Sequence, residues 1–283
     1  MRHASHLSIG EIHLTFSDCN SADLPANFAS FAVEPAPALT TLCAVATARS
    51  EKPRAPALAE NEVWQLCDLG DRLCFTGGVP DLPYPLMRAD IAPDWSHADI
   101  RVDAEAPRLT RLAPVTSHFG ELMVLAQLTQ IGGLYVHAAT VAWDGEAHVL
   151  LGASGAGKST LSRLAEHEGA TVLSDDRTVL REDNGVLYAH GTPFHGTAAR
   201  WAAKKLPVRS LTFLSHALDM RFAPHAPLLS AAKLLSLCFT PFWSKDSVER
   251  AAASVARLTA LVPSRAFGFV PTAAAAKALR EAA

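Results

Sequence analysis

A glycine-rich segment near the middle of the chain carries the most specific chemical signal in this sequence. Residues 149–164 are VLLGASGAGKSTLSRL, in which Gly152, Gly157, Lys158 and Ser159 have the spacing G-x-x-x-x-G-K-S. Between a strand and a helix, such a loop turns backbone N–H groups toward an anion, and the helix N-terminus adds partial positive charge. The lysine of this pattern reaches β- and γ-phosphates, and the serine hydroxyl binds Mg²⁺. The spacing therefore predicts a nucleotide phosphate site, the alternative being an accidental match in a surface turn.

The segments on either side of the loop must position it. Two apolar runs flank Asp144-Gly145, a dipeptide suited to a tight hairpin turn, so the strand that enters the loop is expected to be the second arm of an antiparallel hairpin. The segment KSTLSRLAEHEG after the loop is expected to be a helix that ends at Gly169. The residues expected to bind the nucleotide are Gly152, Ser154, Gly155, Ala156, Gly157, Lys158, Ser159 and Thr160.

Two adjacent aspartates follow at a short distance. Asp175 and Asp176 lie 17 and 18 residues after Lys158, which leaves room for one helix and one returning strand, ATVLSDD. Because the carboxyl ends of strands line the ligand crevice in open α/β sheets, both carboxylates are expected to face the phosphates. One would hold the metal, and the other would accept the proton of an attacking hydroxyl. A solvated turn is the alternative. An ion pair with Arg177 would keep one pKa low, which suits a metal ligand better than a base.

A histidine lies on the first arm of the predicted hairpin. His137, in the segment YVHAATV, is expected to come beside the loop when the hairpin folds. A lone histidine on an apolar strand is equally well explained as a satisfied core residue, so the residues alone leave both roles open.

Taken together, VHAATVAWDGEAHVLLGASGAGKSTL and VLSDD resemble the catalytic domain of HPr kinase/phosphorylase and its HPr-kinase-like relatives. In that family a histidine-bearing strand precedes a hairpin into the P-loop, and an Asp-Asp pair ends the strand after the P-loop helix. The resemblance covers about residues 117–283 and is strongest over 133–180. It implies an α/β P-loop kinase core of the HPr kinase or phosphoenolpyruvate carboxykinase type, with a mixed sheet, that phosphorylates serine using ATP and Mg²⁺.

The resemblance also implies a role for each matching residue. Lys158 matches the phosphate-binding lysine, and Ser159 matches the magnesium ligand. His137 matches the histidine that supports the aspartates. Asp175 matches the metal-associated aspartate and Asp176 the general base, although adjacent carboxylates can exchange these roles. The catalytic set is therefore Asp176, Asp175, His137 and Lys158, and the metal ligands are Ser159 and Asp175.

The segment after the aspartates departs from the HPr kinase pattern. The signature that grips the HPr protein is missing, and GTPFHGTAARWAAKK stands in its place. That segment resembles a motif of the HPr-kinase-like relatives, several of which are thought to act in peptide modification, so HPr is not the expected substrate and phosphorolysis stays open. Residues 191–209 are expected to form a loop with a helical piece. His195, Arg200 and Lys204 are the candidate substrate contacts, with a solvated helix face as the alternative.

The 283-residue chain is long enough for two domains. Residues 1–117 hold eleven of the eighteen prolines between short apolar runs, which predicts a β-rich N-terminal domain of unknown role. Strands are expected over 8–16, 41–48, 62–69 and 72–78. Residues 118–283 are expected to form the catalytic domain.

Composition excludes several classes of function. The net charge of −3 and the lack of basic runs argue against nucleic-acid binding, and no apolar run is long enough for a membrane span. The five cysteines, Cys19 among them, include no C-x-x-C pair, so neither a zinc site nor a thioredoxin-like motif is expected. An odd cysteine count without a signal peptide predicts a cytoplasmic protein. Assembly into a homo-oligomer is left open.

The leading hypothesis is an ATP-dependent kinase with a hydroxyl acceptor, most simply a serine of a peptide or protein. A small-molecule kinase, for instance for free serine, is a second hypothesis, and a non-catalytic ATP-binding interaction or regulatory module is a third. A transport or motor ATPase is disfavoured, because no LSGGQ-like signature follows the loop and the aspartates come too early for a distant Walker B strand.

Overall fold

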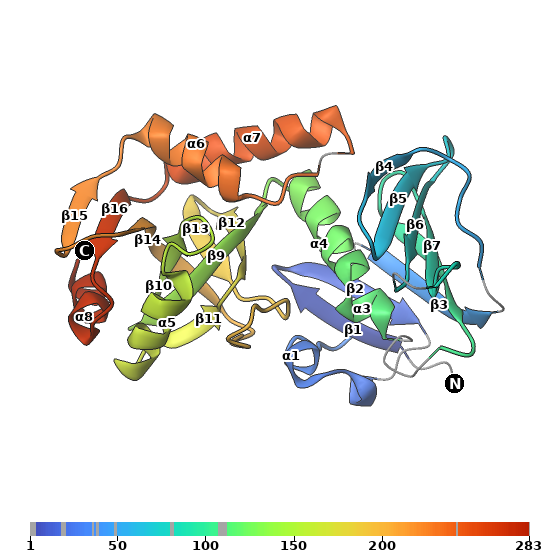
Figure 1. The fold of residues 1–283 in the computed structure, drawn as a ribbon, viewed down its shortest axis with the longest axis horizontal. Helices are drawn as coiled ribbons and strands as arrows, with labels where there is room; N and C mark the ends of the chain where they lie inside the picture. The colour runs from blue at the N-terminus through green and yellow to red at the C-terminus, as the bar shows by residue number, and fades with distance from the viewer. Residues whose placement is uncertain are drawn as a thin grey trace. The chain divides into compact units, whose positions relative to one another are not determined.

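The computed structural model describes residues 4–17, 21–35, 37, 40–47, 50–79, 82–106, 112–241 and 243–282, so Cys19 lies outside the described residues. The chain is a mixed α/β protein (Figure 1), and its described residues form two eight-stranded mixed sheets. One sheet belongs to each of two compact units, Met1–Gln127 and Leu128–Ala283. Among the described helices, none combines the length and apolar character that crossing a membrane requires.

The first unit is built on a sheet with the strand order β1-β2-β3-β8-β7-β6-β5-β4. Strand β3 pairs in parallel with both β2 and β8, and the other neighbours are antiparallel. The strands are β1 (Ala4–Ile9), β2 (Ile12–Ser17), β3 (Thr40–Thr47), β4 (Ala57–Glu60), β5 (Trp64–Asp68), β6 (Leu73–Gly77), β7 (Met87–Ile91) and β8 (His97–Asp103). The described helical segments are a 3-10 turn (Ser21–Asp23), α1 (Ala26–Ala29), α3 (Ala113–Thr116) and α4 (His118–Gln130).

The expected single strand over residues 8–16 is wrong. The chain reverses at Gly10 and Glu11, whose φ angles of 60° and 62° form a left-handed two-residue turn between β1 and β2. Apolar residues are buried on both arms of this hairpin, so the alternating pattern continues through the turn and hides it. The other three expected strands correspond to β3, β5 and β6.

Helix α4 spans the division between the two compact units. The expected boundary at residue 118 falls at its first residue, whereas the compact units divide after Gln127. The Gln127 side chain donates a hydrogen bond to the carbonyl of Trp95 (2.8 Å), and the ring of Phe119 lies 5.2 Å from that of Phe75. These contacts hold most of the helix to the first unit.

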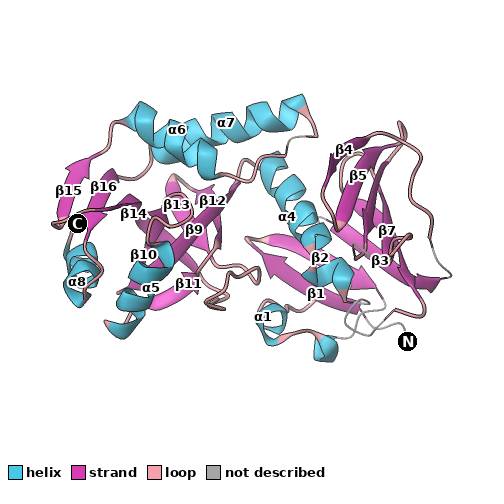
Figure 2. Ribbon diagram, in the orientation of Figure 1, coloured by secondary structure: helices cyan, strands magenta, loops and turns pink. Residues whose placement is uncertain are grey.

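The second unit has the strand order β10-β9-β12-β13-β14-β16-β15, with β11 paired to β9 (Figure 2). A further, parallel pairing of β10 with β14 closes five of these strands into a ring. The strands are β9 (Leu134–Trp143), β10 (Glu146–Leu151), β11 (Thr171–Ser174), β12 (Arg177–Asp183), β13 (Val186–His190), β14 (Lys205–His216), β15 (Arg221–Pro224) and β16 (Ser264–Phe269). The helices are α5 (Lys158–His167), α6 (Pro227–Leu237), α7 (Lys245–Thr259) and α8 (Ala273–Glu281).

Two hairpins in this unit turn on left-handed pairs. Asp144 and Gly145 have φ angles of 53° and 85°, and Asn184 and Gly185 have φ angles of 51° and 80°. Positive φ at both central residues matches the right-handed twist of the flanking strands, which is why Asp-Gly and Asn-Gly favour such turns. The prediction that β10 enters the glycine loop as the second arm of an antiparallel hairpin is confirmed.

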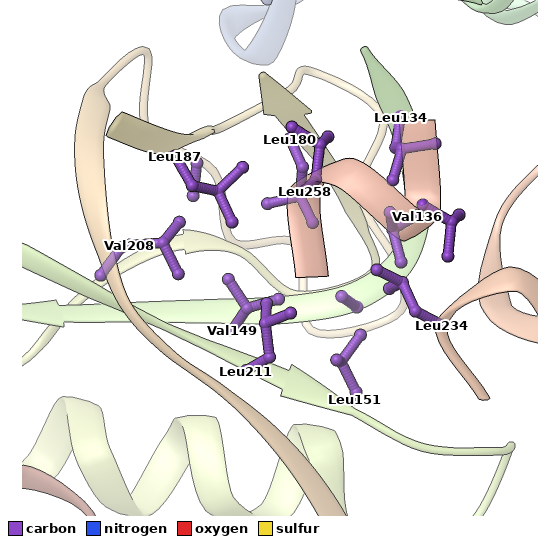
Figure 3. Packing of buried hydrophobic residues seen from close by; sticks show 14 of the residues in the cluster. Leu134, Val136, Val149, Leu151, Leu180, Leu187, Val208, Leu211, Leu234 and Leu258 are labelled. Atoms are coloured by element: carbon purple, nitrogen blue, oxygen red, sulfur yellow. The ribbon is translucent and has the colours of Figure 1, made fainter. Parts of the chain in front are cut away.

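The core of the second unit lies on both faces of its sheet. Alternate residues of β9 point to opposite faces, so Leu134, Val136 and Ala138 join one apolar cluster, while Ala139, Val141 and Trp143 join another. Helices α6 and α7 close the first cluster with Leu234 and Leu258, which Figure 3 labels, and with Val255. Helices α5 and α8 close the second with Leu161, Ala275 and Leu279. Packing on both faces fixes the strand that leads into the glycine loop.

One buried histidine makes the stability of this unit depend on pH. His148 on β10 is 2% exposed, and its Nδ1 lies 3.3 Å from the Ser210 hydroxyl. Burial lowers the pKa of His148 to about 4, and the charges of Arg265 and Arg209 act in the same direction. Above the ordinary histidine pKa the group is neutral in both states. As pH falls below that value the unfolded chain binds the proton first, so the free energy of unfolding must decrease.

Between the ordinary histidine pKa and the lowered pKa of His148, we therefore expect the wild-type protein to lose about 1.4 kcal/mol of unfolding free energy per pH unit, roughly 3 kcal/mol in all. His148→Gln should flatten that dependence, because no titrating group remains at the site. Urea unfolding between about pH 7 and about pH 4.5 measures the effect. His167→Gln, which changes an exposed histidine at the end of α5, is the matched control. Equal slopes for all three proteins would contradict this role for His148.

Candidate functional site

The glycine loop joins β10 to α5 and presents the start of that helix. Gly155 and Gly157 have left-handed backbones, with φ angles of 81° and 97°. Gly157 is the N-cap residue of α5, and a Cβ there would lie 2.6 Å from the ring of Phe269. Because the N-cap carries no side chain, it cannot cap the first-turn N–H groups of α5, which are left for a ligand. Ser154 and Ser159 are exposed, and Ala156 and Thr160 are half-buried.

Lys158 folds back over the beginning of the loop. Its side chain is largely buried, and Nζ donates hydrogen bonds to the carbonyls of Gly152 (2.6 Å) and Ala153 (3.2 Å). Burial lowers the pKa of Lys158, and the negative charge of Asp176 acts in the opposite direction. The lysine is thus within electrostatic range of one of the two aspartates.

A tight turn between β11 and β12 positions the two aspartates. The Ser174 hydroxyl donates to the carbonyl of Arg177 (2.6 Å) and accepts from the N–H groups of Asp176 (3.3 Å) and Arg177 (2.9 Å). The Thr192 hydroxyl donates to the same carbonyl (2.8 Å). Sequence reasoning missed the role of Ser174, although serine favours turns because its hydroxyl can bond the backbone two residues further on.

Asp176 lies between an imidazole and a guanidinium group. One carboxylate oxygen is 3.1 Å from Nδ1 of His137, and the other accepts a hydrogen bond from Arg177. His137 on β9 and Arg177 on β12 are cross-strand partners, so strand register sets both contacts. Burial by itself raises the pKa of Asp176, but the hydrogen bond from His137 and the charges of Arg177, His137 and Lys158 outweigh it and lower the pKa. The ion pair considered for one of the aspartates therefore forms at Asp176, which stays ionised at neutral pH.

Aromatic side chains lie against Arg177 and His137. The Arg177 guanidinium lies 4.4 Å from the ring centroid of Phe239, whose ring is also 5.1 Å from that of Tyr135. His137 itself is 31% exposed at its side chain, which does not fit the alternative of a satisfied core histidine. The histidine instead reaches the surface beside Asp176.

Asp175 points to the loop that follows β13. It is 4% exposed, and one of its oxygens accepts a hydrogen bond from the N–H of Gly196 (2.8 Å). A Cβ at Gly196 would lie 3.0 Å from the Cβ of Asp176, so the loop packs directly on the acidic turn.

The expected helical piece within residues 191–209 is wrong. The described chain runs without a helix from 191 to 204, and β14 begins at Lys205. Backbone groups there pair with the end of β11 instead, since Trp201 bridges Ser174 and the N–H of Ala202 donates to the carbonyl of Leu173 (3.0 Å). This pairing explains why the segment is ordered without helical hydrogen bonds.

A cavity of about 340 Å³ lies between the start of α5 and this loop. Ser159, Thr160, Arg163, Thr197 and Arg200 contribute to its lining, so the structure brings two predicted nucleotide contacts together with one predicted substrate contact. Arg200 pairs with Glu166 across the cavity wall (2.8 Å). His195 is exposed and stacks on Trp201 (5.3 Å), Lys204 is exposed, and neither belongs to this lining.

Two further residues that sequence reasoning missed contact the glycine loop. His216 Nε2 lies 2.7 Å from the carbonyl of Gly155, and its ring stacks on Phe269 (6.2 Å). Both residues end strands that run parallel to β10 or to its neighbour β14, so they lie at the same edge of the sheet as the loop. Only knowledge of the strand order could have pointed to them.

These features define a mixed α/β unit in which a glycine loop before a helix lies beside a turn with two aspartates. The family model of the SynChlorMet cassette protein ScmC matches residues 114–263, more than half of the chain, and the protein belongs to that family. No curated protein matches the chain. Among solved structures, the Hpr(Ser) kinase/phosphatase from Coxiella burnetii is 15% identical, with 52% of this chain and 94% of that chain covered and a TM-score of 0.31.

The two left-handed glycines of the loop should respond differently to substitution. Gly155→Ala meets nothing within 4 Å and should cost only the left-handed backbone penalty, about 1–2 kcal/mol. Gly157→Ala adds the collision with Phe269 and should cost roughly 1–3 kcal/mol more. Urea unfolding of both variants measures the difference. Phe269→Leu combined with Gly157→Ala should recover part of the added loss, and equal losses for the two single variants would show that the ring contact is unimportant.

Proposed function

We propose that the second unit is an ATP-dependent kinase that transfers the γ-phosphate to a hydroxyl, with a serine of a peptide or protein as the acceptor class. The observation that carries this proposal is the Asp176 carboxylate, which is held between His137 and Arg177 within electrostatic range of Lys158. In kinases a positioned aspartate accepts the proton of the substrate hydroxyl, and Asp176 offers an oriented, ionised carboxylate for that role.

The residues of the loop fit ATP and Mg²⁺. The uncapped first turn of α5 offers backbone N–H groups to phosphate oxygens, and Lys158 would exchange the two carbonyls that it now contacts for those oxygens. Ser159 and Asp175 supply a hydroxyl and a carboxylate, the oxygen ligands that Mg²⁺ prefers. When bound, Mg²⁺ neutralises charge on the β- and γ-phosphate oxygens. Asp175 suits this role because the N–H of Gly196 fixes one of its oxygens and leaves the other for a ligand.

Asp176 then acts on the acceptor hydroxyl. The acceptor oxygen forms a bond to the γ-phosphorus while the bond from that phosphorus to the β,γ-bridging oxygen breaks, which yields a phosphate ester and ADP. The hydroxyl proton passes to Asp176. The lowered pKa of Asp176 would by itself suit a metal ligand better than a base, so in this role Asp176 is a weak base that orients the hydroxyl and takes the proton late, as the new bond forms. His137 keeps the carboxylate in place throughout.

Three observations support a peptide or protein as the acceptor. The cavity beside Ser159 and Thr160 is bounded by a surface loop and carries Arg163 and Arg200, which suit backbone carbonyls or an acidic chain end. The segment GTPFHG of that loop resembles the HPr-kinase-like relatives that are thought to modify peptides. The family is described as a cassette protein, in keeping with action on the product of a neighbouring gene.

Substitution of the carboxylate separates transfer from binding. Asp176→Asn should lower the rate of phosphate transfer by about 10²–10⁴-fold and leave ATP affinity nearly unchanged, because the loop is intact. Lys158→Met should weaken both. Transfer of labelled γ-phosphate to serine peptides and to free serine, with calorimetry for ATP binding, measures the two effects. Asp183→Asn, at the exposed far end of β12, the strand that Asp176 directly precedes, is the matched control.

The outcome also separates the competing functions. Label on free serine alone identifies a small-molecule kinase. Tight ATP binding with no label on any hydroxyl contradicts the kinase proposal, whether ATP is hydrolysed rapidly or not at all. If ATP is bound but not hydrolysed, a non-catalytic nucleotide-binding module is indicated.

The acid limb of the transfer rate should depend on Arg177. In the wild type the lowered pKa keeps Asp176 ionised to below the ordinary aspartate value, so kcat/KM should hold as pH falls toward that value. Arg177→Met removes a positive charge while the raising effect of burial persists, so the limb should move to higher pH. The pH profile of kcat/KM tests this. Arg280→Met, which breaks a surface ion pair with Asp144, should leave the limb in place, and an unmoved limb in Arg177→Met would contradict the assignment of Asp176.

A further inference from the structure

Three side chains of different ligand chemistry converge in the first unit. The proposed function uses none of these three side chains. Cys43 lies on β3, and His97 and Asp99 lie on β8. One ligand atom from each side chain lies within 4.8 Å of the other two, and Nε2 of His97 is 3.0 Å from a carboxylate oxygen of Asp99. The group thus joins a thiol, an imidazole and a carboxylate at one point on the sheet.

Strand register builds this cluster. In the parallel pairing of β3 with β8, Cys43 is the direct partner of Asp99, and His97 precedes Asp99 by two residues and so shares its face. Leu42, Ala98 and Ile100, which alternate with these residues, are buried, so the cluster is on the face that is open to solvent. Backbone hydrogen bonds on both sides of β3 fix the positions from which the three side chains extend.

The ligand set selects a class of metal. A thiolate, an imidazole and a carboxylate together suit a borderline-soft ion, and Zn²⁺ accepts all three. Zinc bonds of about 2.0–2.3 Å place the ligand atoms of a tetrahedral site roughly 3.3–3.8 Å apart. Small side-chain rotations bring the three ligand atoms from their observed separation to that geometry. The side chains have room to rotate, because Cys43 and His97 are half-buried and Asp99 is exposed.

We propose that Cys43, His97 and Asp99 bind a zinc ion on the first unit, with a fourth position open to water or another ligand. The Ser17 hydroxyl lies 3.8 Å from the Cys43 sulfur, where a hydrogen bond to the thiolate orients it. The site is independent of the kinase proposal, whose Mg²⁺ ligands are oxygens on the second unit. The sequence predicts no zinc site, because the chain has no C-x-x-C pair. The proposed cluster departs from that expectation, because its ligands come from strands far apart in sequence and leave no such local spacing.

Titration of the metal-free, full-length protein with Co²⁺ tests the proposal, since Co²⁺ occupies zinc sites and reports its ligands by absorption. We expect a thiolate-to-cobalt charge-transfer band and intense tetrahedral d–d bands, both abolished by one equivalent of Zn²⁺. Cys43→Ser should abolish the charge-transfer band. His97→Gln and Asp99→Asn should weaken Co²⁺ affinity by about 100-fold or more, beyond what loss of an outer partner costs. Cys238→Ser, which removes a thiol of the second unit, should leave spectrum and affinity unchanged.

A measurement on the unmodified chain covers the case in which a variant fails to fold. Zn²⁺ should slow the alkylation of Cys43 by iodoacetamide at least 10-fold, as read by mass spectrometry, because a bound thiolate is shielded. The buried Cys67 and Cys74 should stay unmodified with and without Zn²⁺, which checks that the protein remains folded during the reaction. The proposal is overturned by a missing charge-transfer band, by a band that survives in Cys43→Ser, by unchanged affinity in both His97→Gln and Asp99→Asn, or by alkylation of Cys43 that ignores Zn²⁺.

Discussion

The pairing of β9 with its three neighbours decides where the charged groups of the candidate site lie. Its antiparallel register with β12 sets His137 opposite Arg177, and its register with β10 fixes the strand that runs into the glycine loop. Strand β11, which ends at the acidic turn, pairs with β9 as well. A slip of one residue would turn His137 into the core and break the contacts of Asp176. The register of this one strand therefore sets the positions of the loop, the histidine and both aspartates.

Several of these charges are buried or half-buried, and each has a compensating partner. Lys158 contacts two carbonyls, Asp175 accepts a backbone N–H, and Asp176 lies between His137 and Arg177. A buried charge without such partners is strongly destabilising, whereas a partnered one can be exchanged for a ligand at modest cost. The arrangement suits a site in which phosphate oxygens and a hydroxyl replace existing hydrogen bonds, and this is the physical basis of the kinase proposal.

Local chemistry made part of this fold predictable. Asp144-Gly145 and Asn184-Gly185 mark turns that need two left-handed residues, and the G-x-x-x-x-G-K-S spacing places a glycine loop before a helix whatever surrounds it. The turn at Gly10 and Glu11 was hidden because apolar alternation continues through it. The segment 191–204 was misjudged as partly helical because its backbone partners are at the end of β11. His216 and Phe269 reach the loop, and Cys43 reaches His97, only through pairings between strands distant in sequence. No pattern in a single segment reports such contacts.

The closed ring of strands has a consequence for how the chain reaches this arrangement. The hairpins β9–β10 and β12–β13 join neighbouring segments and can form early, whereas the parallel pairing of β10 with β14 must wait for residues some sixty positions further along. Until β14 arrives, one side of β10 is an open sheet edge, and neither His216 nor Phe269 is present to hold the loop. The motif with the clearest signature in the sequence is therefore among the last parts to take its final shape. A nascent chain that already contains the loop lysine and both aspartates still lacks the later strands that hold these residues in the geometry of the site.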